Sequence, residues 1–190
     1  MEVAAVDELD PSVLEHVTLP DRIQGGWEIN GYRIADVSTE DEPNRSGGRR
    51  ARWSHDIIWR LESGKYALYR SSQSHVYHSD PTTCLTRAGA MSGERVRADD
   101  LPDGAIACWV CEPPYPDELR PRDWVRYEWP RQSLAVCEEP HQVIDQLTTS
   151  TRYSGAQVSG VPDNTLKLIG QARDNDSYFA TADQPVRRIG

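Results

Sequence analysis

Hydrophobic and polar residues alternate in short runs through the middle of the chain, a pattern typical of antiparallel strands. The clearest run covers residues 53–62, and a turn at residues 63–64 leads into a second run over residues 65–71. A third short run follows at residues 74–78. Because runs separated by short turns tend to pair with their neighbours in sequence, we expect a three-stranded meander that ends at His78.

Further strands are expected on both sides of this meander. Residues 27–37 read as strand, with the Asn-Gly pair at residues 30–31 as a strong hairpin signal. Residues 123–130 and 132–137 read as a second hairpin. The chain is therefore expected to be rich in antiparallel β-structure.

Three helices complete the predicted elements. Asp10, followed by proline at the first helical position, predicts a short helix over residues 10–17. Hydrophobic residues at core spacing predict a second helix over residues 138–147. A third helix is expected from residue 162 to about residue 174.

These elements predict the α+β fold class, with antiparallel meander and hairpins, a zinc knuckle and a few short helices. We expect an acidic leader with the short helix at residues 1–26 and a single α+β domain at residues 27–148. Within that domain the knuckle region spans residues 74–114. Residues 149–190 are expected to form a linker and a C-terminal helix that packs on the domain.

Charge is distributed unevenly along the 190 residues. The net charge is −9, and residues 1–42 hold 11 acidic and only 2 basic residues, whereas residues 43–190 hold 19 of each. An acidic protein is a poor nonspecific ligand for the phosphate backbone of nucleic acids. The exception is the stretch 45–52, in which Arg49, Arg50 and Arg52 either belong to a solvated loop or contact a phosphate or an acidic partner.

The sequence predicts neither a membrane span nor export. No apolar run approaches about 18 residues, and the N-terminus lacks the basic and apolar regions of a secretory signal. We therefore expect a cytoplasmic protein without membrane contact. In that reducing compartment the four cysteines would be metal ligands or free thiols rather than disulfides.

Four residues have the spacing of a closed zinc site, namely His78, Cys84, Cys108 and Cys111. The two-residue gap of a Cys-x-x-Cys lets one tight turn direct both thiolates at one ion. Unmetallated thiols and a redox dithiol are the alternatives; the latter is disfavoured because Glu-Pro-Pro, and not a helix, follows the pair. His75 and Cys137 compete with His78 for the fourth position.

The order of these ligands resembles the metal-binding domain of the Ada methylphosphotriester repair protein, over about residues 65–114. The gap between His78 and Cys84 is longer than in that module, and Ala107 replaces its usual proline. The resemblance implies a zinc ion bound by the four residues. The methyl-acceptor role does not carry over, because the chain lacks a methyltransferase segment and a basic DNA-binding surface.

The full chain is also similar to small uncharacterised zinc-knuckle proteins of high-GC bacteria and their phages. The similarity lies in the strand at residues 53–62, the knuckle, and residues 136–141 before a helix. This resemblance implies a phage or mobile-element origin and no particular activity.

No catalytic motif stands out, since the sequence has no glycine-rich phosphate loop, no G-x-S-x-G and no H-E-x-x-H. The leading hypothesis is a non-enzymatic, zinc-stabilised interaction or regulatory protein of inhibitor-like type, with Trp109 at the knuckle tip as a contact. The second is nucleic-acid binding through the knuckle and residues 45–52. The third is an enzyme whose catalytic groups the sequence does not reveal.

Overall fold

The computed structural model describes most of the chain, namely residues 9–19, 25–43, 47, 51–80, 84, 93–150 and 162–181. Contacts between residues divide the chain into two compact units, which are described separately here. Unit 1 comprises residues 1–39, 55–71 and 132–190, and unit 2 comprises residues 40–54 and 72–131. The predicted boundaries after residues 26 and 148 stay predictions.

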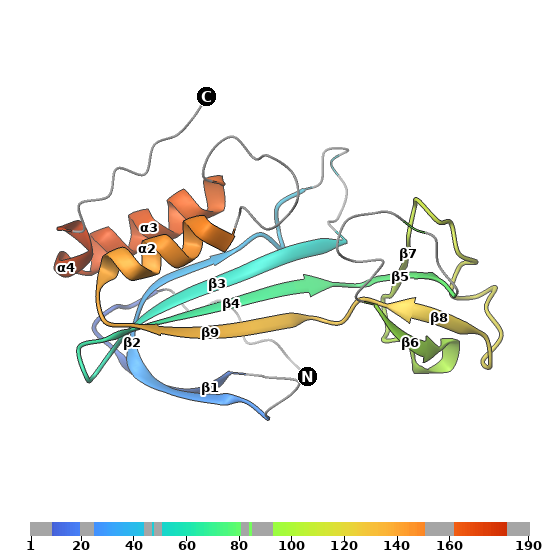
Figure 1. Ribbon diagram of the computed structural model, residues 1–190, viewed down its shortest axis with the longest axis horizontal. Coiled ribbons are helices and arrows are strands. Elements are labelled where there is room, and N and C mark those ends of the chain that lie inside the picture. The colour runs from blue at the N-terminus through green and yellow to red at the C-terminus, as the bar shows by residue number, and fades with distance from the viewer. Residues whose placement is uncertain are drawn as a thin grey trace. The chain divides into compact units, whose positions relative to one another are not determined.

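A five-stranded sheet with the strand order β1-β2-β3-β4-β9 forms the frame of unit 1 (Figure 1). Its strands are β1 (Leu14–Leu19), β2 (Trp27–Ser38), β3 (Arg52–Leu61), β4 (Tyr66–Ser74) and β9 (Arg131–Cys137). Three helices cover one face, α2 (Pro140–Ser150), α3 (Asp163–Asn175) and α4 (Ser177–Ala180). The α+β class is thereby confirmed, as are the helices expected after residues 138 and 162.

Both faces of this sheet are buried at its centre. Tyr66 and Leu68 of β4 pack with residues of α2, α3 and α4, including Phe179. Ala67 and Tyr69 point the other way and pack with Trp59 and residues of β1 and β2. Strand side chains alternate between faces, so a run such as residues 66–69 can be hydrophobic throughout only where both faces are covered.

The helix predicted over residues 10–17 is wrong, because β1 occupies Leu14–Leu19 and pairs antiparallel with β2. The capping chemistry of Asp10 is present, since its carboxylate accepts a hydrogen bond from the Ser12 amide at 2.9 Å. That interaction closes a turn rather than a helix. Val17 and Leu19 then pack on the hydrophobic face of the sheet, and this burial outweighs the local helix signal.

The hairpin turn predicted at residues 30–31 is also wrong, because β2 runs straight through Gly31. A β-carbon at Gly31 would lie 2.8 Å from the carbonyl oxygen of Arg60 on the neighbouring strand. The glycine therefore permits a close approach of two backbones instead of making a turn. By contrast, the turn between β3 and β4 is confirmed, and Gly64 adopts the left-handed φ of +82° there.

A four-stranded sheet with the order β6-β8-β5-β7 forms unit 2. Its strands are β5 (Val76–Ser79), β6 (Glu94–Arg97), β7 (Ile106–Ala107) and β8 (Trp124–Tyr127), and the short helix η1 (Ala98–Asp100) follows β6. β5 and β7 run parallel, whereas β8 is antiparallel to both β5 and β6. The third strand of the predicted meander is therefore in a different sheet from the first two.

The predicted hairpin over residues 123–137 is wrong for a related reason. β8 belongs to the smaller sheet and β9 to the larger one. Pro130 lies between them and has no amide hydrogen to donate, so the ladder does not continue across it.

Candidate metal centre

The parallel pairing of β5 with β7 brings the first two candidate ligands together. Val76 lies opposite Ile106 and Tyr77 opposite Ala107, so Cys108, which follows β7 directly, comes level with His78. The Cys108 amide donates to the Tyr77 carbonyl at 2.9 Å and continues the ladder by one residue. An imidazole and a thiol that are 30 positions apart in sequence thereby become neighbours.

The knuckle, residues 108–111, brings Cys111 back to the same point. The Glu112 amide donates to the Cys108 carbonyl at 2.9 Å, and Glu112 has a φ of +45°, which is rare for a residue other than glycine. This tight turn directs the Cys108 and Cys111 thiols at one position, which is the mechanical value of a two-residue gap.

Two distances between donor atoms match the edges of a zinc tetrahedron. The Sγ atoms of Cys84 and Cys108 are 3.7 Å apart, and Cys111 Sγ is 3.6 Å from His78 Nδ1. Zinc at about 2.3 Å from sulfur and about 2.1 Å from nitrogen would place two sulfurs ~3.8 Å apart and a sulfur and a nitrogen ~3.6 Å apart. All four donor atoms lie within 4.8 Å of one another, so the set fits one tetrahedral ion.

The four candidate ligands take the place of a hydrophobic core on their face of the small sheet. His78, Cys84 and Cys108 are buried, and the two cysteines pack with Val76 and partly buried Cys111. Burial raises the pKa of the Cys111 thiol, and the other two thiols raise it further. With its pKa raised, Cys111 stays a neutral thiol unless a cation stabilises the thiolate, and a metal ion between the four donors would do so.

A carboxylate outside the ligand set orients the imidazole. Nε2 of His78 lies 2.6 Å from Oε1 of Glu128, which leaves Nδ1 as the nitrogen that faces the thiols. Metal-bound histidines commonly donate their second N–H to such a carboxylate, which fixes the tautomer and the ring plane.

Glu128 is itself held by two further side chains. Arg52 donates to both of its oxygens at 2.9 and 2.6 Å, and the Ser74 hydroxyl donates to Oε2 at 2.7 Å. Burial raises the pKa of Glu128, but the hydrogen bonds from His78, Arg52 and Ser74 outweigh it and bring the pKa down to about 2. Glu128 is thus a buried, ionised and fully engaged carboxylate.

The structure separates the competing ligands from the site. The His75 ring packs against Trp53 with ring centroids 4.8 Å apart, and His75 is not among the clustered donors. Cys137 is buried in the core of unit 1 beneath the helices. Of the candidates, His78 is therefore the one that joins the three cysteines.

The residues predicted to contact partners have different surroundings. Trp109 is 80% exposed at the tip of the knuckle, beside Val110, which is 41% exposed. Arg52 is bound to Glu128 and so has an intramolecular partner. Arg49 and Arg50 lie outside the described residues. Nucleic-acid binding through residues 45–52 stays a prediction.

Sequence reasoning missed Glu128, Ser74 and the role of Arg52, because none of them has a motif spacing to the ligands. One signal was available at Glu128, an acidic residue set between Tyr127 and Trp129 in a run that otherwise reads as buried. A carboxylate in such a position needs a strong partner.

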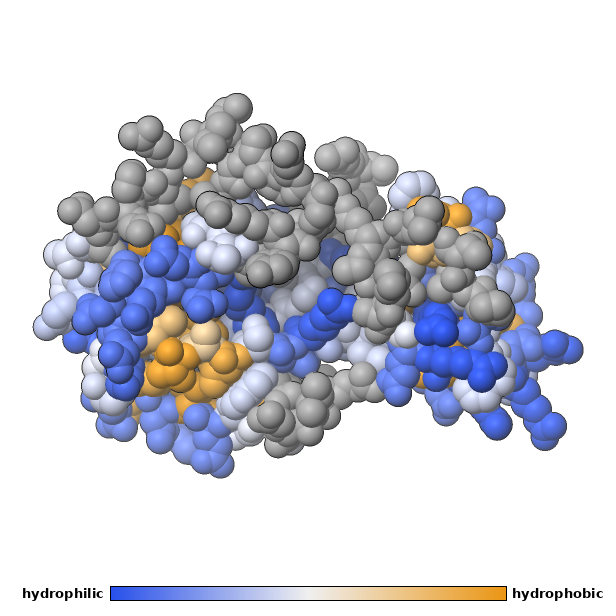
Figure 2. Space-filling view, viewed as in Figure 1, coloured by the Kyte–Doolittle hydropathy of each residue, from blue (hydrophilic) through white to orange (hydrophobic). Residues whose placement is uncertain are grey.

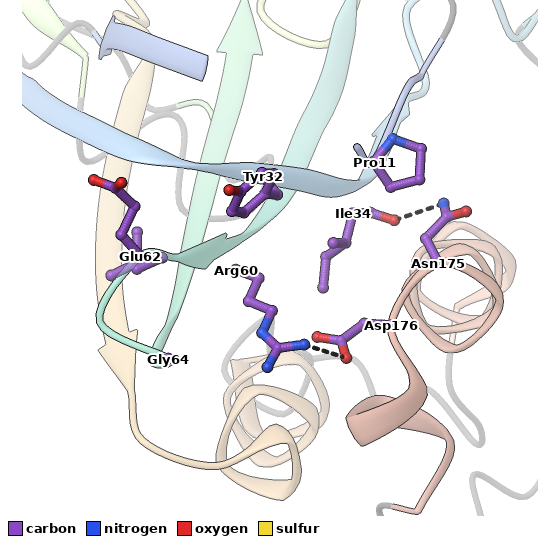
Figure 3. A pocket seen from close by; sticks show the side chains of 9 residues that line it. Pro11, Tyr32, Ile34, Arg60, Glu62, Gly64, Asn175 and Asp176 are labelled. Carbon is purple, nitrogen blue, oxygen red and sulfur yellow. Dashed lines mark hydrogen bonds and ion pairs between the residues drawn. The ribbon is translucent and has the colours of Figure 1, made fainter. Parts of the chain in front are cut away.

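A pocket of about 490 Å³ lies in unit 1, between β-strand residues and the last helices (Figure 3). Its buried carboxylate, Asp176, accepts a hydrogen bond from Arg60 at 3.2 Å and caps α4 by accepting from the Tyr178 amide. Glu62 points away from this pair. Asp176 is thus engaged in holding the chain, and we assign the pocket no catalytic role.

In comparisons with known proteins, no protein-family model, no curated protein and no solved structure matches the chain. The resemblances to the Ada module and to phage-associated zinc-knuckle proteins stay predictions. None of the described helices has the length and apolar composition needed to cross a membrane.

Proposed function

We propose that this chain is a non-enzymatic interaction protein in which a structural zinc ion fixes a knuckle that contacts another protein. The observation that carries the proposal is the coexistence of two features on residues 108–111. Cys108 and Cys111 belong to a compact donor set, whereas Trp109 between them is 80% exposed.

The donor set favours a structural rather than a catalytic ion. Three thiols and one imidazole are the ligands zinc prefers, and four protein ligands fill a tetrahedron. A hydrolytic zinc enzyme needs an open position for water, and this set provides none. The proposal therefore assigns the ion to folding, where its binding free energy adds to stability.

The knuckle supplies exposed apolar side chains for a contact. Trp109 and Val110 are both exposed, and tryptophan is enriched among residues that dominate binding energies. Clustered exposed apolar side chains do not stabilise a free monomer and often mark a site of contact with another protein. The surplus of negative charge in residues 1–42 offers a second contact of inhibitor-like type for a basic partner.

The first test is the metal content of the purified protein by elemental analysis. We expect one zinc ion per chain, a lower content in His78→Ala, and a lower melting temperature in Cys108→Ser. Folded, reduced protein without metal would overturn the zinc assignment.

The second test compares capture of host proteins by wild type and by Trp109→Ala. Tyr178→Ala is the matched control, since Tyr178 is an exposed aromatic residue of unit 1. We expect a partner that is lost with Trp109→Ala and kept with Tyr178→Ala. Equal capture by all three proteins would contradict the role of the knuckle.

A further inference from the structure

A row of arginines crosses one face of the small sheet in unit 2. In the strand register Arg95 of β6 lies opposite Arg126 of β8, and Arg97 lies opposite Trp124. Residues directly opposite one another in an antiparallel pair share a face, so all four side chains lie on one face. We call this set, Arg95, Arg97, Trp124 and Arg126, the Arg–Trp face.

Two of the three arginines lie over the tryptophan ring rather than extending into solvent. The guanidinium carbon of Arg95 lies 4.2 Å from the centre of the Trp124 ring, and that of Arg97 lies 5.3 Å from it. Trp124 is nevertheless 40% exposed. The result is an accessible layer made of one aromatic ring and two planar cations.

Negative charge on this face is insufficient to neutralise it. Asp80 forms ion pairs with Arg95 and, at 3.4 Å, with Arg126. Among the residues that the structure describes, Arg97 forms no ion pair. Asp80 bridges the two opposed arginines and offsets their repulsion, so the unneutralised positive charge of the face is that of Arg97 and the excess of two arginines over one carboxylate.

The face has a definite limit along the strand. β6 is at the edge of its sheet, and Asp99 and Asp100 follow it in η1, so the excess of positive charge ends there. Figure 2 shows strongly hydrophilic side chains over the part of the surface where β6 and β8 lie. The surface is small, which suits a few consecutive groups of a ligand rather than a long duplex.

We propose that the Arg–Trp face binds single-stranded nucleic acid. Guanidinium groups bind phosphate oxygens in a bidentate manner, and unpaired bases stack on aromatic rings and on guanidinium planes. An acidic peptide would bind the arginines through its carboxylates, but acidic side chains have no aromatic ring that could stack on exposed Trp124 or on the guanidinium groups. Because bases are stacked away inside a duplex, the aromatic layer favours a single strand.

This inference goes beyond the proposed function, because none of its residues belongs to the knuckle, although Arg126 lies opposite His78 in the strand register. It differs also from nucleic-acid binding through residues 45–52, because no residue of that stretch belongs to the Arg–Trp face. The net positive charge of the Arg–Trp face is local, so it is compatible with the net negative charge of the whole chain.

The test is fluorescence anisotropy of a labelled 12-residue oligothymidylate titrated with the full chain at low salt. We expect binding that weakens with added salt, with a slope of about −0.7 per phosphate engaged and so about −2 for three arginines. Arg97→Glu should weaken binding at least tenfold, a larger loss than the removal of one phosphate contact gives. Trp124→Ala should weaken it by about 5- to 150-fold, which is the range for losing one stacked base.

Two controls separate binding from folding and from general charge. Arg131→Glu makes the same charge change at an exposed arginine outside the Arg–Trp face and should bind like wild type. Trp124→Phe keeps an aromatic ring in place and should retain most of the affinity, whereas Trp124→Leu keeps apolar volume without a ring and should bind as weakly as Trp124→Ala.

Three results would overturn the proposal. The first is no anisotropy change at low salt, and the second is equal weakening by Arg97→Glu and Arg131→Glu. The third is displacement of the oligonucleotide by polyglutamate of equal charge as readily as by unlabelled oligothymidylate, which would assign the face to acidic polypeptides instead. Melting temperatures of all variants close to that of wild type ensure that the losses report binding.

Discussion

The two ring nitrogens of His78 have different partners, and this arrangement determines which nitrogen faces the three thiols. Nδ1 faces Cys111, while Nε2 lies 2.6 Å from Glu128. Without the carboxylate, the imidazole could rotate or present the wrong tautomer to an ion. Glu128 is therefore a positioning residue, and its contribution can be measured separately from that of the ligands.

Replacing Glu128 with glutamine should lower zinc affinity by about 10- to 100-fold, the range found for groups that orient metal ligands. The amide keeps the shape of the side chain but weakens the hydrogen bond that holds His78. Competition with a chromophoric chelator measures the affinity.

Glu138→Gln is the matched control, because Glu138 is an exposed partner of Lys65 in unit 1. Its zinc affinity should equal that of wild type. Equal affinity of Glu128→Gln and wild type would show that the ligands need no such support.

Asp36 in unit 1 is the residue from which we expect a dependence of stability on pH. Burial raises its pKa, but hydrogen bonds with His55 at 2.7 Å and Arg33 at 2.9 Å outweigh burial, so the pKa lies below its usual value. A carboxyl group with a lowered pKa stabilises the fold above its unfolded pKa of about 3.9 and loses that effect as pH falls toward the folded value.

Asp36→Asn should therefore unfold more easily than wild type at pH 7, by roughly 1–3 kcal/mol, the cost of disrupting a partly buried hydrogen-bonded group. The difference should shrink below pH 4. Urea unfolding at a series of pH values measures it, with the exposed Asp145→Asn as control. A difference that stays constant between pH 7 and pH 3 would contradict the ionised state of Asp36.

At the scale of elements, two glycines should respond to the same substitution with opposite signs. A β-carbon at Gly31 would meet the Arg60 carbonyl oxygen at 2.8 Å, whereas one at Gly170 of α3 would meet nothing within 4 Å. Gly31→Ala should destabilise the pairing of β2 with β3 by about 1–3 kcal/mol through overpacking. Gly170→Ala should stabilise by about 0.5–1 kcal/mol, because alanine is the better helix former.

Thermal or denaturant unfolding of the two variants beside wild type checks this pair. Because each serves as the other's control, a general effect of alanine is excluded. Destabilisation by both variants would show that α3 does not have the open surroundings at Gly170 described here.

The positions of the strands in the sequence could be predicted better than the pairing of those strands in the sheets. The runs over residues 53–62 and 65–71 and the turn between them became β3 and β4, because a short turn leaves little choice of pairing. The run at residues 74–78 has the same alternation, yet β5 pairs with β7 and β8. Alternation tells which residues share a face and does not tell which strand lies alongside.

The same limit explains the two halves of the candidate site. His78, Cys84, Cys108 and Cys111 could be predicted because donor chemistry and the Cys-x-x-Cys spacing are visible in sequence. Glu128 directly follows β8, 50 positions from His78, and has no motif spacing to it. The antiparallel pairing of β8 with β5 brings the two together. The spacing of nearby residues predicts the turn that holds two ligands. The residue that orients His78 is brought there by pairing between strands, which the spacing does not reveal.

At the scale of the molecule, the two units have cores of different kinds. Unit 1 has hydrophobic clusters on both faces of its sheet, whereas unit 2 has a smaller hydrophobic cluster around Tyr77, Val125 and Tyr127 and contains all four candidate ligands. Removal of zinc by a chelator under reducing conditions should therefore unfold unit 2 selectively. Metal binding free energy is folding free energy in such sites.

Hydrogen exchange read by mass spectrometry checks this expectation. Amides of β5 and β8 should lose protection after chelation, while those of α2 and α3 should keep theirs. The Cys108→Ser variant should give the same pattern without a chelator. Uniform loss across both units would mean that they unfold as one, and no loss would mean that the ion has no structural role.

The order of the two units along the chain has a consequence for synthesis. Every group of the candidate metal centre, from Arg52 to Glu128, has been synthesised by residue 131, whereas unit 1 still lacks β9 and the three helices that cover its sheet. Chains emerge from the ribosome N-terminus first and fold as segments become available. Unit 2 could therefore bind the proposed zinc ion while unit 1 is still incomplete, and a shortage of zinc would then affect the nascent chain before the larger core of unit 1 has formed.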